Sequence, residues 1–166
     1  METECSKKYE KLTETLIKRG VSVTTMESCT GGVVAALITD TEGASAILKG
    51  AYITYSNEAK CMCGVPEGVI AEYGVYSEET AGAMAAACRE AFGADLGIGI
   101  TGTFADPDPA NPGSSLGEVF FAICYEEGGM INCESHRMQT SDAENRHDAR
   151  MMVADRVADA VLRIVE

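Results

Sequence analysis

The stretch that decides the fold is Thr24-Thr25-Met26-Glu27-Ser28-Cys29-Thr30-Gly31-Gly32. A run rich in β-branched residues, Val21–Thr25, leads into it, and a small apolar run, Val33–Ile38, leads out of it. This order predicts a strand, a sharp turn, and a helix from Thr30 to about Asp40. Because a helix N-terminus carries unpaired N–H groups and the positive end of the helix dipole, the turn favours anions. We therefore expect the rest of the chain to build a pocket against this turn.

The remaining chain alternates helical and extended patterns. Apolar spacing and capping residues predict helices at residues 6–19, 56–63, 66–73 and 77–92, and a last helix from Ser141 or Asp142 to Val165. Runs of β-branched and aromatic residues predict strands at 51–55 and 96–101, and a hairpin of residues 117–125 and 130–138. Strands that alternate with helices and end in a hairpin indicate an α/β sandwich with a mixed sheet. With 166 residues and neither a linker nor a repeat, we expect one domain over residues 1–166.

Composition and charge exclude several classes of protein. The net charge is −13, whereas a nucleic-acid-binding protein needs a cationic face, so we expect no nucleic-acid partner. No apolar run approaches the roughly 18 residues that a membrane span requires, so we expect no membrane partner. The start, Met1-Glu2-Thr3-Glu4, is acidic and polar, unlike a secretory signal. The expected location is therefore the cytoplasm.

The seven cysteines are odd in number, and with an intracellular location they are expected to be free thiols. The pair Cys61-x-Cys63 lacks the spacing of a zinc knuckle, and no second cysteine pair or histidine pair completes a ligand set. We therefore expect neither a metal nor a cofactor.

Ser28 is the leading candidate for a nucleophile. The backbone N–H groups of Thr30, Gly31 and Gly32 could hold an oxyanion or a phosphate beside it. The alternative is that Ser28 or Thr30 is an ordinary helix cap. Cys29 is the rival nucleophile, since a helix N-terminus lowers a thiol pKa, but it could equally be a small buried hydrophobe.

Lys60 supplies a candidate base. It falls in the first turn of the short helix that begins at Ser56 or Asn57, where the positive end of the helix should lower its pKa and favour a neutral amine. A neutral amine beside a serine activates the hydroxyl without histidine, and Tyr55 could relay the proton or orient the amine. The alternative is a surface lysine paired with Glu58 or Glu67.

Arg146 and Arg150 form a third group. Their i, i+4 spacing puts both on one helix face, and that face continues through the apolar residues Val153, Val157 and Val161. Two guanidinium groups at the pocket end of such a face suit a phosphate or a carboxylate. The alternative is that they pair with acidic residues of the same segment, namely Asp142, Glu144 and Asp148.

These groups, in this order, resemble the C-terminal domain of the competence/damage-inducible protein CinA, a family that occurs both fused to a larger protein and alone. The matching pieces span most of the chain: Glu27-Ser28-Cys29-Thr30-Gly31-Gly32, Thr54-Tyr55-Ser56-Asn57-Glu58-Ala59-Lys60, Gly74-Val75-Tyr76-Ser77-Glu78-Glu79-Thr80, Ile100-Thr101-Gly102, Gly117 with the strand after it, and Arg146 with Arg150. The resemblance implies a three-layer α/β/α sandwich and a homo-oligomer. It also implies an amidohydrolase that converts nicotinamide mononucleotide to nicotinic acid mononucleotide and ammonia.

By the same resemblance, Ser28 would attack the carboxamide carbon, and Lys60, supported by Tyr55, would take the serine proton and later protonate the leaving ammonia. The other residues would bind the small-molecule nucleotide, with one of the two arginines on its phosphate: Thr30, Gly31, Gly32, Asn57, Thr101, Arg146 and Arg150.

One segment departs from the family pattern. After Ile100-Thr101-Gly102 the family continues through Ala-Gly-Pro into a Gly-Gly loop, whereas here Asp106 replaces the small glycine and the Gly-Gly pair is absent. Asp106 and Asp108 would repel a phosphate. Two alternatives therefore stay open: a nucleotide-binding member with weak or no activity because of the altered 102–115 loop, and a thiol enzyme that uses Cys29.

Overall fold

The computed structural model describes residues 2–166, which form a five-stranded mixed sheet in the order β2-β1-β3-β4-β5. The strands are β1 (Val23–Glu27), β2 (Leu48–Ile53), β3 (Leu96–Gly102), β4 (Glu118–Glu127) and β5 (Met130–Gln139). β1 runs parallel to both β2 and β3, whereas β3, β4 and β5 pair antiparallel. The predicted mixed sheet and hairpin are confirmed.

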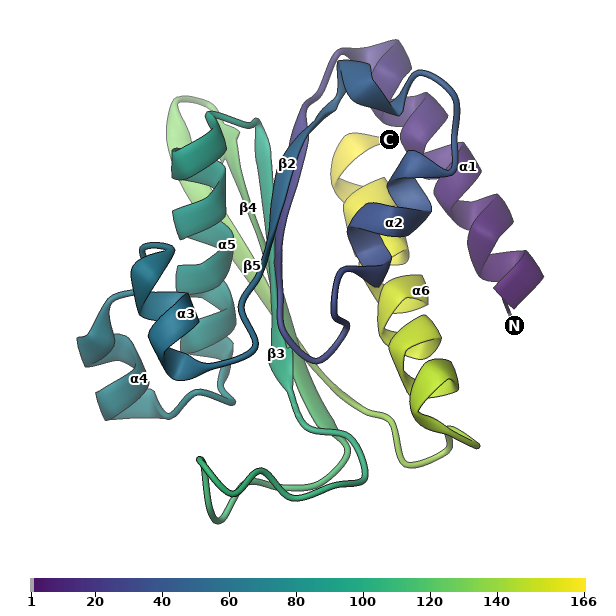
Figure 1. Cartoon of the computed structure of the whole chain (residues 1–166). Coiled ribbons are helices and arrows are strands. Elements are labelled where there is room, and N and C mark those ends of the chain that lie inside the picture. Colours follow the sequence, from purple (N-terminus) through teal and green to yellow (C-terminus); the bar gives the residue numbers. More distant parts are fainter. Residues whose placement is uncertain (1) are drawn as a thin grey trace.

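Helices cover both faces of the sheet, as Figure 1 shows. One face carries α1 (Glu2–Arg19), α2 (Val33–Thr39) and α6 (Arg146–Val165); the other carries α3 (Asn57–Met62), α4 (Glu67–Tyr73) and α5 (Glu78–Phe92). A single 3-10 turn, Ala44–Ala46, precedes β2. The expected α/β/α sandwich is confirmed.

Two glycines of β3 let α5 pack unusually close to the sheet. A Cβ at Gly97 would collide with the Ala85 carbonyl oxygen, and a Cβ at Gly99 would collide with the Ala81 carbonyl oxygen. Every residue of β3 is buried. The Gly/Ile alternation of residues 97–100 therefore reflects close helix–sheet contact, as the sequence indicates.

Several element boundaries differ from the expectations, and three of these differences lie near Ser28 or in α6. α2 begins at Val33 rather than Thr30, because Gly31 and Gly32 adopt left-handed conformations, with φ of 59° and 94°, and form a turn. β2 ends at Ile53, opposite the last residue of β1, so residues 54–55 leave the sheet. α6 begins at Arg146 rather than Ser141 or Asp142, because the Asn145 side chain accepts a hydrogen bond from the Asp148 amide at 3.0 Å and caps the helix there.

The expectation that all cysteines are free thiols is wrong for one pair. Cys124 and Cys133 lie directly opposite each other in the β4–β5 register and form a disulfide, with Cα atoms 4.1 Å apart. The other five cysteines are free. Hairpin register, which a count of cysteines does not reveal, brings this pair together.

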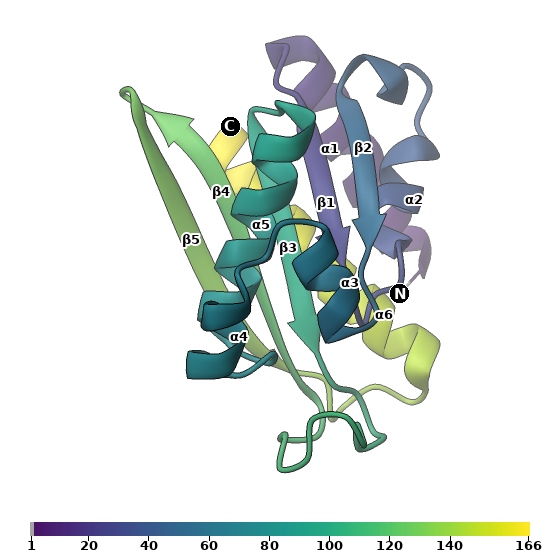
Figure 2. The same cartoon turned by 60° about the vertical axis from the view of Figure 1, so that its left-hand side comes forward.

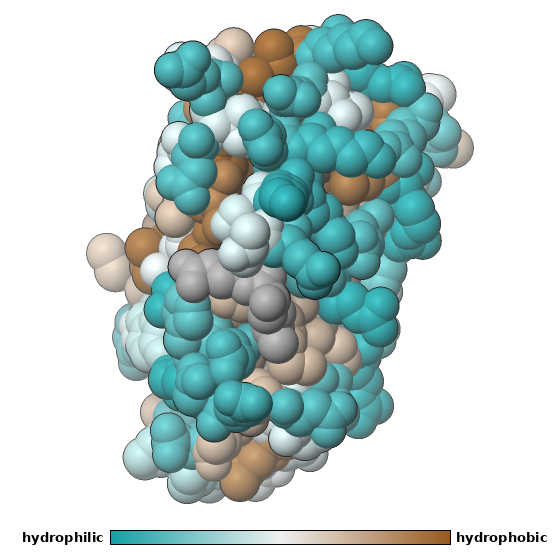
Figure 3. Space-filling model, turned by 90° about the vertical axis from the view of Figure 1, so that its right-hand side faces the viewer, coloured by the Kyte–Doolittle hydropathy of each residue, from teal (hydrophilic) through white to brown (hydrophobic). Residues whose placement is uncertain are grey.

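The face covered by α1, α2 and α6 is mostly hydrophilic, and its hydrophobic residues are scattered among polar ones (Figure 3). This surface agrees with the acidic composition. Within residues 2–166, no helix combines the length and the apolar character that crossing a membrane requires.

The loop of residues 103–117 extends beyond the carboxyl end of β3, at the end of the molecule where α3, α4 and the start of α6 also lie (Figure 2). The connection through α2 joins β1 to β2 across one face, and the connection through α3, α4 and α5 joins β2 to β3 across the other. Ligands of open α/β sheets bind where successive connections change face, outside the carboxyl ends of the strands. Ser28, the residue after β1, occupies this position.

Candidate active site

Ser28 and Lys60 meet at the carboxyl end of β1. The Lys60 Nζ lies 3.2 Å from the Ser28 Oγ and donates a second hydrogen bond to the Thr54 carbonyl oxygen at 2.8 Å. Ser28 is 7% exposed and Lys60 only 2%. The two residues that the sequence suggested as nucleophile and base are thus in hydrogen-bond contact, although 32 positions separate them.

Short-range structure fixes the lysine in this place. The Thr54 amide donates to the Glu27 carbonyl oxygen at 2.8 Å, which anchors the segment after β2 to the end of β1. The Ser56 hydroxyl then caps α3 by accepting from the Ala59 amide at 3.1 Å. The single short helix that follows directs Lys60 inward, and the alternative of a surface lysine paired with Glu58 or Glu67 is wrong.

Burial lowers the pKa of Lys60 to about 8, against the opposing effect of Cys29, Asp108 and Cys61. The direction of this pKa shift agrees with the expectation from sequence. The main cause differs from the expected one. It is the loss of hydration on burial, which disfavours the charged ammonium, and not the helix dipole. At pH 7 a pKa near 8 leaves about one lysine in ten as the neutral amine.

Cys29 does not have the activated thiol expected at a helix N-terminus. It is 5% exposed, and burial, followed by the charge of Glu27, raises the pKa of its thiol to about 12. A thiol with this pKa is protonated at neutral pH and is a poor nucleophile. The prediction of a lowered thiol pKa is therefore wrong, and the reading of Cys29 as a small buried residue is the one that fits.

Glu27 occupies the anion site that the turn was expected to offer to a ligand. Its fully buried carboxylate accepts hydrogen bonds from the amides of Gly32, Val34 and Ala35 at 3.0–3.2 Å, and one from the Thr25 hydroxyl at 3.2 Å. An internal carboxylate therefore neutralises the N-terminus of α2. The sequence motif contains Glu27, but no role was predicted for it. An acidic residue just before a helix is the signal that could have indicated its contact with the N-terminal amides of that helix.

In this structure the amides of Gly31 and Gly32, which are predicted to bind an anion, have hydrogen-bond partners within the chain. The Gly31 amide donates to the Ser28 carbonyl oxygen at 2.8 Å, and the Gly32 amide is bound to Glu27. The third member of that set, Thr30, has a buried side chain, and its carbonyl oxygen accepts from Arg150.

The two arginines have separate roles. The Arg150 Nε donates to the Thr30 carbonyl oxygen at 2.7 Å, so this side chain braces the turn. The Arg146 Nη2 donates to the Tyr55 hydroxyl at 2.7 Å, and its guanidinium lies 5.1 Å from the centre of the Phe104 ring. Its Nη1 is 3.7 Å from the Asp106 carboxylate. The predicted shared helix face is confirmed to point toward the site, but Arg146 pairs with the loop rather than with its own helix.

Tyr55 does not contact Lys60. It is 63% exposed, and its hydroxyl accepts from Arg146. The support of Lys60 by Tyr55 therefore stays a prediction, and in this structure the Thr54 carbonyl oxygen orients the amine.

Thr101 and Asn57 also lie elsewhere than expected. Thr101 is fully buried and donates to the Val75 carbonyl oxygen at 2.9 Å, so it holds β3 to the segment before α5. The Asn57 side-chain amide donates to Asn111 at 3.2 Å and so attaches α3 to the loop. Neither residue lines the cavity beside Ser28, because each is bonded to another part of the chain.

A cavity of about 370 Å³ opens in front of Ser28, with Lys60 behind the serine rather than on the wall. Its walls come from the turn, from Tyr55 and Tyr76, from residues 102–109, and from Arg146. Asp108 accepts a 2.5 Å hydrogen bond from the Tyr76 hydroxyl and a 2.7 Å bond from Asn111, and the first of these is the main cause that lowers the pKa of Asp108. The divergent loop is thus folded into the wall of the site.

Comparison with known proteins identifies the family. Residues 6–164 match the family model of the CinA C-terminal domain. The chain belongs to this family. A crystal structure of a competence or damage-inducible protein from Enterobacter asburiae superposes with a TM-score of 0.86 at 27% identity and covers 98% of each chain.

Two relatives show the range of proteins in the family. The nicotinamide-nucleotide amidohydrolase PncC of Escherichia coli K12 is 41% identical over 131 residues, which are 78% of this chain and 79% of that protein. A CinA-like protein of Chlorobium chlorochromatii is 39% identical over 131 residues, but these are only 31% of its length. The chain thus spans less than a third of the length of the Chlorobium protein and most of the length of the Escherichia coli protein.

Proposed function

We propose that the protein is an amidohydrolase that converts nicotinamide mononucleotide to nicotinic acid mononucleotide and ammonia, with Ser28 as nucleophile and Lys60 as general base. The observation that carries the proposal is the 3.2 Å contact between the Lys60 Nζ and the Ser28 Oγ at the wall of a cavity. The Escherichia coli relative, a nicotinamide-nucleotide amidohydrolase, supplies the substrate class.

In the first step, neutral Lys60 accepts the Ser28 hydroxyl proton as the Oγ attacks the carboxamide carbon. The hydroxyl turns its proton toward the amine, while the Thr54 carbonyl oxygen holds the amine in place. The amides of Gly31 and Gly32 are engaged within the chain, so the turn would have to release one of them to hold the oxyanion.

In the second step, the lysine ammonium returns the proton to the amide nitrogen, the C–N bond breaks, and ammonia leaves an ester on Ser28. Lys60, neutral again, then takes a proton from water as the water oxygen attacks the ester carbon. The C–O bond to Ser28 breaks, the serine regains a proton from Lys60, and the carboxylic acid product leaves. One amine thus serves as base and acid in both halves of the reaction.

Ammonia release from nicotinamide mononucleotide, with the acid product identified by mass spectrometry, tests the proposal. We expect turnover by the wild-type protein and a loss of about 10²–10⁴-fold in kcat for Lys60→Ala, the range typical of a general base. A Lys49→Ala variant, which removes a lysine remote from the cavity, is the control and should keep wild-type turnover. Equal turnover in Lys60→Ala and the control would contradict the proposal.

A second candidate function is a nucleotide-binding protein without turnover, because two carboxylates of the divergent loop, Asp106 and Asp108, line the cavity. Calorimetry with nicotinamide mononucleotide and its acid product separates the two candidates. Binding of both without ammonia release would favour this second function.

A further inference from the structure

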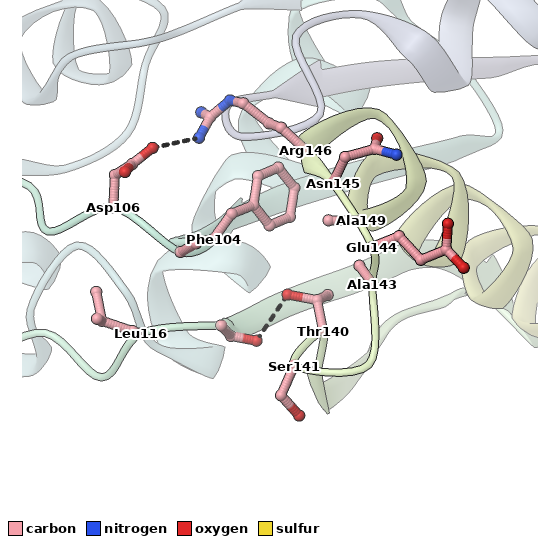
Figure 4. Close-up of a pocket in the computed structure, with 12 residues that line it drawn as sticks. Phe104, Asp106, Leu116, Thr140, Ser141, Ala143, Glu144, Asn145, Arg146 and Ala149 are labelled. Carbon is pink, nitrogen blue, oxygen red and sulfur yellow. Dashed lines mark hydrogen bonds and ion pairs between the residues drawn. The ribbon is translucent and has the colours of Figure 1, made fainter.

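The Asp106–Arg146 pair lies between two cavities. One is the cavity in front of Ser28, and the other, of about 380 Å³, lies between the loop and the start of α6. Both are lined by Phe104, Asp106 and Arg146. Figure 4 shows the second cavity, with the Asp106 and Arg146 side chains pointing toward each other along its rim and the Phe104 ring below the guanidinium.

The charges that line the Ser28 cavity are two carboxylates, Asp106 and Asp108, and one guanidinium, Arg146. Arg150 does not line this cavity, and its Nε is used on the Thr30 carbonyl oxygen. A phosphate that enters from the rim therefore meets Arg146 as its cationic partner, and Asp106 already occupies one side of that guanidinium.

The pair is loosely held. The two side chains are 50% and 84% exposed, and the closest nitrogen–oxygen distance is 3.7 Å, which is beyond an ordinary hydrogen bond. Exposed ion pairs of this kind contribute little, so a dianionic phosphate can displace the single carboxylate. The displaced carboxylate remains on the neighbouring loop and continues to oppose the phosphate.

We propose that Asp106 determines how strongly this site prefers a phosphorylated nicotinamide ribonucleoside to the same nucleoside without phosphate, by competing with the substrate phosphate for Arg146. This inference rests on the proposed function for the substrate class. Both ligands carry the same cationic pyridinium ring, which the cavity carboxylates attract equally, so the difference between them isolates the phosphate. The preference for the mononucleotide over the riboside should therefore be weaker than it would be with a neutral side chain at position 106.

The experiment measures dissociation constants of nicotinamide mononucleotide and nicotinamide riboside by calorimetry, on protein that carries Ser28→Ala so that neither ligand is consumed. The quantity compared is the affinity for the mononucleotide divided by the affinity for the riboside. We expect Asp106→Asn, which removes the charge and keeps the shape, to raise this ratio about three- to tenfold, the scale of an exposed charge pair acting on a dianion.

Two further variants separate competition from general repulsion. In an Arg146→Gln background the gain from Asp106→Asn should disappear, since the guanidinium for which Asp106 competes is gone. Asp40→Asn changes the net charge equally at an exposed site at the end of α2 and should leave the ratio at its starting value. Melting curves confirm that each variant is folded.

A ratio that stays within twofold in Asp106→Asn would overturn the inference, and so would a gain that persists without Arg146. Failure of the proposed function gives a different result, because wild-type protein would then release no ammonia while the binding ratios still respond to Asp106. Binding of neither ligand would overturn both claims.

Discussion

At the scale of single residues, the proposed chemistry depends most on the surroundings of Lys60. Its amine has two hydrogen-bond partners, the Ser28 hydroxyl and the Thr54 carbonyl oxygen, and is 2% exposed. Loss of hydration brings the pKa of the amine to about 8, within reach of neutral pH. A neighbouring thiol in the same interior is shifted the other way, because burial raises the pKa of Cys29 to about 12. Burial therefore favours the neutral amine and disfavours the thiolate, which supports the proposal that serine, not cysteine, is the nucleophile.

The titration of Lys60 predicts the pH dependence of activity. Since the neutral amine is the active form and the pKa is lowered to about 8, kcat/KM should rise about tenfold per pH unit below pH 8 and level off above it. The measurement is the initial rate of ammonia release at low substrate from pH 6 to pH 9.5. A profile that is flat across this range, or that falls as the pH rises through 8, would exclude Lys60 as the base.

At the scale of elements, the contact between α5 and β3 depends on residues without side chains. A Cβ at Gly99 would lie 2.5 Å from the Ala85 amide nitrogen and 2.8 Å from the Met84 Cβ, and would also collide with the Ala81 carbonyl oxygen. These atoms all belong to α5 and leave the added carbon no space, so α5 must shift away from the sheet. The carboxyl end of β3 borders the Ser28 cavity, which links this contact to the site.

Gly99→Ala should therefore lower the free energy of unfolding by roughly 1–3 kcal/mol, as overpacking does in a filled interior. Gly82→Ala is the matched control, because Gly82 is inside α5 and a Cβ there meets nothing within 4 Å. That substitution should raise the free energy of unfolding by about 0.5–1 kcal/mol through helix propensity. Urea denaturation of both variants gives the two values, and equal effects would contradict the packing described for β3.

The N-terminus of α2 shows what pattern reasoning misses. The sequence pattern predicts a turn before α2 whose amides bind a ligand. In the structure the buried Glu27 carboxylate accepts from the Gly32 amide of that turn and from two amides of α2, those of Val34 and Ala35. Sequence spacing predicts which face of the sheet a strand residue occupies. It does not predict whether the side chain of the last strand residue hydrogen-bonds to the N-terminus of the next helix.

At the scale of the whole molecule, most of the architecture was predictable because each element carries its own signal. The β-branched runs, the Ser56 and Ser77 caps and the hairpin all appear where local chemistry places them. Contacts between distant segments were harder to predict. Thr101 bonds to Val75 and Tyr55 to Arg146, and both depend on which strands and loops become neighbours.

The Ser28–Lys60 contact was predictable in outline because Ser28 directly follows β1 and Lys60 lies in the first helix after the neighbouring parallel strand β2. The register of β1 and β2 sets Glu27 opposite Ile53, so the segments that follow start side by side. The single domain, the cytoplasmic location and the homo-oligomer are not tested by these contacts and stay predictions.

The central claim is that Ser28, not Cys29, attacks the carboxamide. Ammonia release from nicotinamide mononucleotide by Ser28→Ala and Cys29→Ala, measured side by side with wild-type protein, tests it most directly. We predict a loss of at least about 10³-fold in kcat for Ser28→Ala, as for removal of a serine nucleophile, and a loss of less than tenfold for Cys29→Ala. Turnover by Ser28→Ala at the wild-type rate, or its loss in Cys29→Ala alone, would show that Ser28 is not the nucleophile.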